Sequence, residues 1–115
     1  MGAESIHRLN RLYFGQYATE QRDSILEAIS KRKPVPGVYL ITFASNGVDQ
    51  LDVLPLYMAC FQMHKDRLPT IAGVGLGRAE AFETVRRIVE DAYRETGNCR
   101  LQEFLLARDA EGAGT

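Results

Sequence analysis

The amino-acid sequence predicts a small single-domain α/β protein, with an N-terminal helical segment before a β-α-β-α-β core whose three-stranded sheet is mainly parallel. Apolar, β-branched runs of strand length alternate with segments of helical periodicity, and strands joined by helices form parallel sheets through right-handed crossovers. A length of 115 residues, 45% of them hydrophobic, matches one compact domain with its own core. We place this domain at residues 1–108 and expect the glycine-rich segment 109–115 to be a disordered tail.

The first 33 residues have a helix-favouring composition with an expected break near Gly15. From Thr19, a good N-cap, apolar residues follow at helical spacing and predict a helix of about three turns. The part before Gly15 is ambiguous, because its apolar residues suit a helix whereas Leu-Tyr-Phe at 12–14 suits a short strand. A strand within residues 12–17 would give a ferredoxin-like α+β fold, which is the alternative prediction.

Residues 37–44 (GVYLITFA) predict the first buried strand, because they are apolar, β-branched and bounded by turn residues. In residues 50–63, apolar side chains would surround nearly the whole circumference of a helix. We therefore predict a helix that is hidden on more than one side, and that starts or kinks near Leu54 because Pro55 cannot donate a hydrogen bond. Such a helix favours a homo-oligomer.

Residues 69–75 predict a second strand, and residues 78–96 predict a long helix that ends at Gly97. We expect this helix to bury an apolar stripe made of Phe82, Val85, Ile88, Val89, Ala92 and Tyr93. Residues 99–107 (CRLQEFLLA) predict the third strand.

Three glycines in the stretch TIAGVGLGRAEAF, at 73, 75 and 77, could form a phosphate cradle or a tight turn between strand and helix. The dinucleotide pattern G-x-G-x-x-G fails because Arg78 stands three residues after Gly75, and the chain has no Lys-Ser or Lys-Thr pair for a P-loop. The turn is therefore the favoured interpretation.

A ligand site, if one exists, is expected outside the carboxyl ends of the parallel strands, where helix N-termini offer free amides. Two loops qualify, and they share one rim if their strands are adjacent. The candidate ligand-binding residues are Asn46, Asp49, Gly75, Gly77 and Arg78. Arg78 would place a cation there, so a small anionic ligand is the expected class.

Other chemistries have weaker signals. Cys60 and His64 stand four residues apart, a spacing used by metal ligands, but two ligands do not make a site, so we predict no metal and no cofactor. Common hydrolase, zinc-protease and redox motifs do not occur, so no catalytic residue is predicted.

A net charge of −1 argues against nucleic-acid binding, and no apolar run approaches the roughly 18 residues of a membrane span. Two cysteines without a secretory leader predict a cytoplasmic protein with reduced thiols. The leading hypothesis is a non-enzymatic binding or regulatory module that acts as a homo-oligomer. The alternative is a small enzyme, or a protein that binds a nucleotide or phosphate ligand at the rim.

Overall fold

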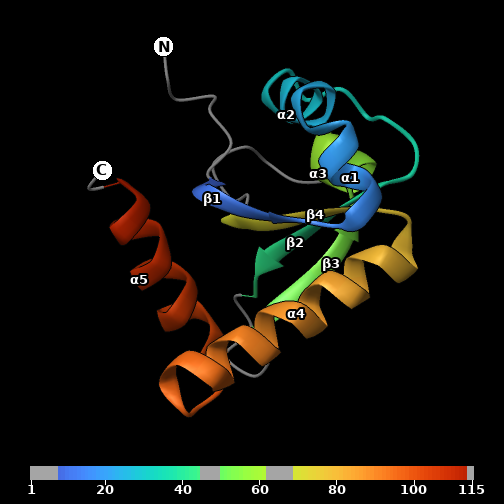
Figure 1. Cartoon of the computed structure of the whole chain (residues 1–115). Helices are drawn as coiled ribbons and strands as arrows, with labels where there is room; N and C mark the ends of the chain where they lie inside the picture. Colours follow the sequence, from blue (N-terminus) through green and yellow to red (C-terminus); the bar gives the residue numbers. More distant parts are fainter. Residues whose placement is uncertain (1–7, 45–49, 62–68, 114–115) are drawn as a thin grey trace.

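The computed structural model describes residues 8–44, 50–61 and 69–113 (Figure 1). The elements are β1 (Arg8–Phe14), α1 (Gln16–Glu20), α2 (Arg22–Ser30), β2 (Val38–Phe43), β3 (Leu51–Pro55), α3 (Leu56–Phe61), β4 (Ile71–Leu76), α4 (Arg78–Thr96) and α5 (Leu101–Ala113). The strands form one sheet in the order β1-β4-β2-β3, in which β1 and β4 are parallel and the other two pairings are antiparallel. The α/β class is confirmed, whereas the three-stranded, mainly parallel sheet is wrong.

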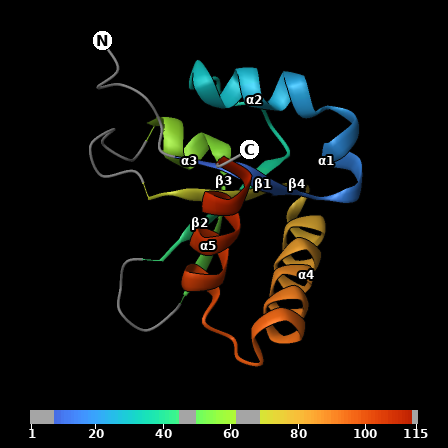
Figure 2. The ribbon, with the colours of Figure 1, turned by 60° about the vertical axis from the view of Figure 1, so that its left-hand side comes forward.

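Helices cover both faces of the sheet (Figures 1 and 2). Helices α1, α2 and α3 pack on one face, and α4 and α5 pack on the other. Successive strand residues alternate between the two cores, so that Leu40 lies in the first and Ile41 in the second. The central strands β2 and β4 are therefore buried on both sides.

The predicted helix over residues 50–63 is wrong for its first part, because residues 51–55 form strand β3; residues 56–61 are helical, and residues 62 and 63 lie outside the described residues. Leu51 to Pro55 pair along the whole of β2, and this long-range pairing overrides the apolar pattern. Pro55 fits the end of an edge strand, where its missing N–H breaks no ladder bond.

The N-terminal segment begins as a strand, β1, and not as a helix. Its backbone pairs with β4, which satisfies groups that an isolated helix would have bonded internally. The strand that the alternative prediction placed within residues 12–17 is present, because β1 reaches Phe14. The fold nevertheless differs from a ferredoxin-like one, because helices cover both faces of the sheet and such α+β folds place them on one face.

Strand β4, helix α4 and its end at Gly97 agree with the sequence prediction. The third strand predicted over residues 99–107 is wrong, since Leu101–Ala113 is helix α5. Leu101, Phe104 and Leu105 have the i, i+3, i+4 spacing of one helix face and are buried in the second core. Residues 109–113, which the sequence assigned to a tail, belong to this helix.

Candidate functional site

A crevice lies at the carboxyl ends of β1 and β4. The chain leaves β1 into α1 on one face of the sheet and leaves β4 into α4 on the other face, which makes this a topological switch point of the kind where α/β sheets bind ligands. A cavity of about 510 Å³ opens here between α1 and α4, lined among others by Tyr17, Leu76, Thr84 and Arg87.

Glu80 occupies the backbone amides of this crevice. Its Oε1 accepts from the N–H of Tyr17 at 2.9 Å, and its Oε2 accepts from the N–H of Ala18 at 3.1 Å and of Leu76 at 2.8 Å. The carboxylate thus ties the N-terminus of α1 to the end of β4. An anionic ligand would have to displace this internal anion from the same donors.

The predicted glycines serve backbone geometry. A Cβ at Gly75 would lie 2.7 Å from the amide nitrogen of Ala81, so glycine allows α4 to approach β4 closely. Gly77 has φ +86°, a left-handed conformation that favours glycine, and its N–H donates to the carbonyl of Gly37 at 2.7 Å. Arg78 is exposed, with its guanidinium 5.6 Å from the centre of the Phe82 ring.

Asn46 and Asp49 lie outside the described residues. Strand β2, which precedes them in the chain, is antiparallel to β4. Val38 pairs with Leu76, whereas Thr42 pairs with Ile71, so β2 ends at the opposite end of the sheet from Gly77. The expectation that the two loops share one rim assumed that β2 and β4 are parallel, whereas they are antiparallel.

Helix α5 covers the free edge of β1. The N–H of Arg11 donates to the Asp109 carboxylate at 2.8 Å, and Arg108 Nη1 donates to the carbonyl of Arg11 at 2.9 Å. Arg11 Nη1 in turn donates to the carbonyl of Arg108 at 3.0 Å. This edge therefore has both a donor and an acceptor already paired.

Tyr13 joins β1 to the helices beside it. Its hydroxyl donates to Asp91 at 2.7 Å, and the guanidinium groups of Arg87 and Arg108 lie 5.6 Å and 4.3 Å from the centre of its ring. Burial, and next the hydrogen bond to Asp91, raise the pKa of Tyr13 to about 12. Burial alone would raise the pKa of Asp91, but hydrogen bonds from Tyr13 and Arg94 outweigh it and lower that pKa.

The opposite edge, β3, is open. Ala44 N–H donates to the carbonyl of Gln50, while Phe43 N–H donates to Thr70 on the β4 side. Because bonding directions alternate along antiparallel strands, Asp52 and Leu54 point their backbone groups towards β2, and residues 51, 53 and 55 point theirs outward. In the described part of the chain no hydrogen bond reaches the outward groups of Leu51 and Val53, whereas the carbonyl of Pro55 accepts the first hydrogen bond of helix α3. All three side chains are partly exposed.

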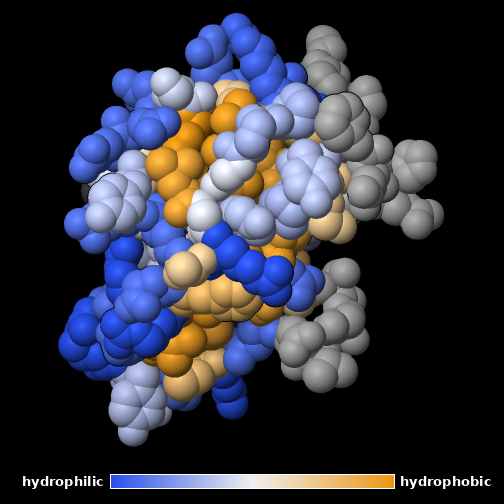
Figure 3. Space-filling model, turned by 90° about the vertical axis from the view of Figure 1, so that its right-hand side faces the viewer, coloured by the Kyte–Doolittle hydropathy of each residue, from blue (hydrophilic) through white to orange (hydrophobic). Residues whose placement is uncertain are grey.

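Helix α4 turns apolar side chains outward beside this edge. Phe82 and Tyr93 were expected in the core but are 50% and 63% exposed, because α4 packs smaller residues (Ala81, Thr84 and Ala92) with Ile88 against the sheet. Val85 and Val89 are half-buried, in the same core as Leu51 and Val53 of β3. Figure 3 shows apolar side chains gathered on one face of the molecule.

Two further features have structural explanations. Burial raises the pKa of the Cys60 thiol, so this thiol is neutral near pH 7; His64 lies outside the described residues.

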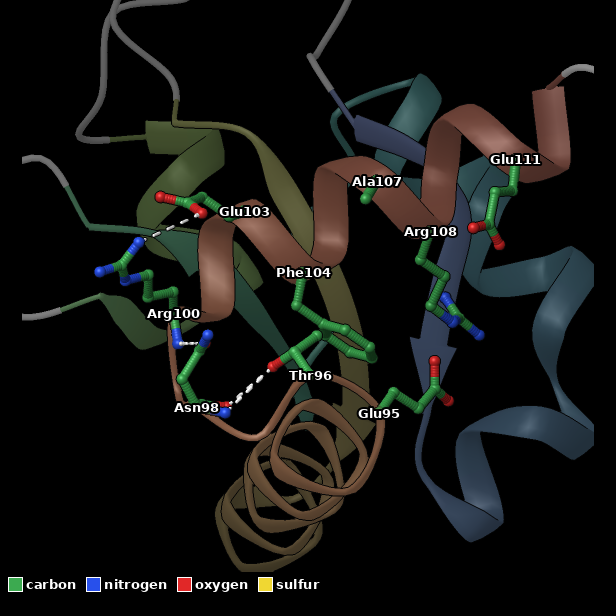
Figure 4. Close-up of a pocket in the computed structure, with 9 residues that line it drawn as sticks. All are labelled: Glu95, Thr96, Asn98, Arg100, Glu103, Phe104, Ala107, Arg108 and Glu111. Atoms are coloured by element: carbon green, nitrogen blue, oxygen red, sulfur yellow. Dashed lines mark hydrogen bonds and ion pairs between the residues drawn. The ribbon is translucent and has the colours of Figure 1, made fainter.

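A groove of about 340 Å³ separates the end of α4 from α5 (Figure 4), with Phe104 in its wall. Asn98 there accepts from the N–H of Arg100 at 2.9 Å and thereby holds the turn between the two helices.

Among residues 8–44, 50–61 and 69–113, no group of three or more His, Cys, Asp or Glu side chains could hold a metal ion. Nor does this part of the chain contain a helix of the length and apolarity that a membrane crossing requires. No protein-family model matches the sequence, and comparisons with curated proteins and with solved structures find no match.

Proposed function

We propose that this protein is a non-enzymatic binding or regulatory module that acts as a homo-oligomer, and that β3 is the edge through which its copies associate. The observation that carries the proposal is the pair of residues with outward backbone groups, Leu51 and Val53, which no described residue pairs. An unpaired strand edge is a template for a strand of another chain. The exposed apolar residues of α4 beside it add surface that a partner could cover.

The test measures the mass of the protein by sedimentation across the micromolar concentration range. We expect a mass that rises with concentration for the wild-type chain and a monomer for Val53→Pro. This substitution removes an outward N–H and leaves the bonds between β3 and β2 intact. Leu106→Ser is the control, because Leu106 is an exposed apolar residue (52%) on α5, away from β3. A wild-type chain that stays monomeric throughout the range would remove the proposal.

A small ligand in the crevice at the ends of β1 and β4 is the second candidate function, because this cavity lies at the switch point. Arg87 supports it: the guanidinium lines the cavity and donates to the carbonyl of Phe14 at 3.0 Å through one nitrogen. Phosphorylated metabolites should then raise the melting temperature of the wild-type protein. Arg87→Ala should abolish this effect, whereas Arg78→Ala should preserve it because Arg78 lies beside Phe82. An unchanged melting temperature with every such compound would exclude this candidate.

A further inference from the structure

We propose that Arg32, at the end of helix α2, binds the phosphate group of a small ligand. This site goes beyond the proposed function, because it involves neither the β3 edge nor the crevice between α1 and α4. Arg32 breaks a local structural rule twice, once with its backbone and once with its side chain. Residues that break such rules without a gain inside the protein are expected at functional sites.

The backbone of Arg32 adopts a conformation that favours glycine. Its φ is +56°, and no other non-glycine residue in the described part of the chain has a positive φ. The N–H of Arg32 donates to the carbonyl of Ile29 at 3.1 Å, and the N–H of Lys33 donates to the carbonyl of Ala28 at 2.8 Å. This is the Schellman arrangement, whose left-handed position glycine usually occupies. The end of the helix therefore gives no reason for an arginine here.

The side chain of Arg32 holds two buried donors, Nε and Nη2, that have no hydrogen-bond partner among the described residues. These two nitrogens lie on one edge of the guanidinium, the edge that binds two oxygens of a carboxylate or a phosphate. A buried charge without a partner is unfavourable. An anion that carries two oxygens on one atom would pair both donors at once.

The groups around Arg32 do not supply this anion. Helices α2 and α3 lie on the same face of the sheet (Figures 1 and 2), and Cys60 of α3 is close enough for Arg32 to lower the pKa of its thiol. Burial outweighs this effect and raises that pKa, so the thiol stays neutral and is only a weak acceptor. Glu27 is ion-paired with Lys31. Within the described residues, no carboxylate forms an ion pair with Arg32 or Lys33.

Charge and exposure favour a phosphate group. Arg32 and the exposed Lys33 are adjacent cations, and together they attract a doubly charged anion more strongly than a carboxylate with one charge. Arg32 is itself partly exposed, so its buried edge lies just beneath the surface. We expect the long side chain to turn this edge outward and the anion to stabilise that arrangement.

Thermal unfolding with inorganic phosphate as the probe, at an ionic strength held constant with sodium chloride, tests the site. The melting temperature of the wild-type chain should rise by roughly 5 °C for each tenfold increase in phosphate above its dissociation constant. Arg32→Lys keeps the charge but lacks the edge with two donors, so phosphate should bind it at least about tenfold more weakly. Arg87→Ala, the matched control in the crevice, should respond to phosphate as the wild-type chain does.

The outcomes separate this site from the crevice. A wild-type melting temperature that does not change throughout the millimolar range, or an equal response of Arg32→Lys and the wild-type chain, would overturn the proposal. A response that Arg87→Ala loses and Arg32→Lys keeps would place the phosphate in the crevice and would also overturn it.

Arg32→Gly provides a second test, which decides the proposal if Arg32→Lys fails to fold. Glycine suits the left-handed backbone and removes the buried charge, so this variant should melt at a higher temperature than the wild-type chain when phosphate is absent. It should also lose the response to phosphate. A lower melting temperature without phosphate would show that the protein itself satisfies the guanidinium, and the proposal would then fail.

Discussion

The two edges of the sheet differ in how their backbone groups are satisfied. At β1, residues at the far end of the chain, Arg108 and Asp109, bond both backbone groups of Arg11. At β3, the outward groups of Leu51 and Val53 meet no described residue. Within the described residues, one edge is thus closed by the fold itself, whereas the other keeps unpaired backbone groups.

The difference follows from the chain path. Strand β1 lies beside β4, so α4 and α5 both reach it after they cross the sheet. Strand β3 is the outer strand of a hairpin, and its only strand neighbour is β2. Proteins commonly protect such an edge by keeping the strand short or by placing a proline or a charged residue in it. Strand β3 has all three features: it is five residues long, it ends at Pro55, and it contains the charged residue Asp52. These devices limit pairing without covering the edge.

The largest loss of stability is expected from a substitution of Glu80, whose carboxylate ties α1 to the end of β4. Glu80→Ala leaves the amides of Tyr17, Ala18 and Leu76 without their acceptor, so the free energy of unfolding should fall by roughly 3 kcal/mol. Glu83→Ala is the matched control on the same helix, because Glu83 is exposed and ion-paired with Arg86, and it should lose less than about 1 kcal/mol. Urea denaturation measures both. Equal losses would show that the three amides need no acceptor.

Tyr13 makes the free energy of unfolding depend on pH. A raised pKa in the folded protein means that Tyr13 stays protonated after the same residue has ionised in the unfolded chain. The contribution of Tyr13 to the free energy of unfolding is complete below the pKa of about 10 that tyrosine has in the unfolded chain. It is lost as pH rises through the pKa of about 12 that Tyr13 has in the folded protein. The loss should approach roughly 2–3 kcal/mol. Urea denaturation across this interval should show the fall for the wild-type chain and a smaller one for Tyr13→Phe; identical curves would contradict the assignment.

Asp109→Ala should open the closed edge. It removes a charge-assisted hydrogen bond to the N–H of Arg11, so the free energy of unfolding should decrease by about 1 kcal/mol. It also gives the sheet a second unpaired edge. We therefore expect sedimentation to detect species larger than the proposed dimer, whereas the control Glu111→Ala, an exposed residue two positions further along α5, should leave the distribution unchanged. A dimer that grows no further would show that Arg108 alone covers β1.

The sequence was informative where local signals decide the structure. Strands β2 and β4 and helix α4 could be predicted because each carries its own apolar pattern and end signals. β3 could not, because its residues become a strand only by pairing with β2. Helix α5 had a usable signal, the i, i+3, i+4 spacing of Leu101, Phe104 and Leu105, which the apolar run around it concealed.

The candidate site depended on pairings that the sequence does not encode locally. Gly75, Gly77 and Arg78 do mark the turn from β4 into α4, but the shared rim required β2 to run parallel to β4. Glu80 was overlooked because its role needs α1, β4 and α4 to meet in space. A glutamate in the first turn of a helix is ordinary in sequence, so no local signal identifies it.

The smallest effect tests the open edge most specifically. If two β3 strands pair so that their Asp52 carboxylates are diagonal neighbours, these lie about 8 Å apart. Their repulsion at that distance in water is about 0.5 kcal/mol, so Asp52→Asn should tighten the dimer roughly twofold. Screening makes the effect depend on salt: the wild-type dimer should strengthen as salt is added, and the Asn variant should not. Sedimentation equilibrium at low and high salt measures both. A much larger gain would place the carboxylates directly opposite each other, as in a register centred on residue 52, and no gain would place them far apart.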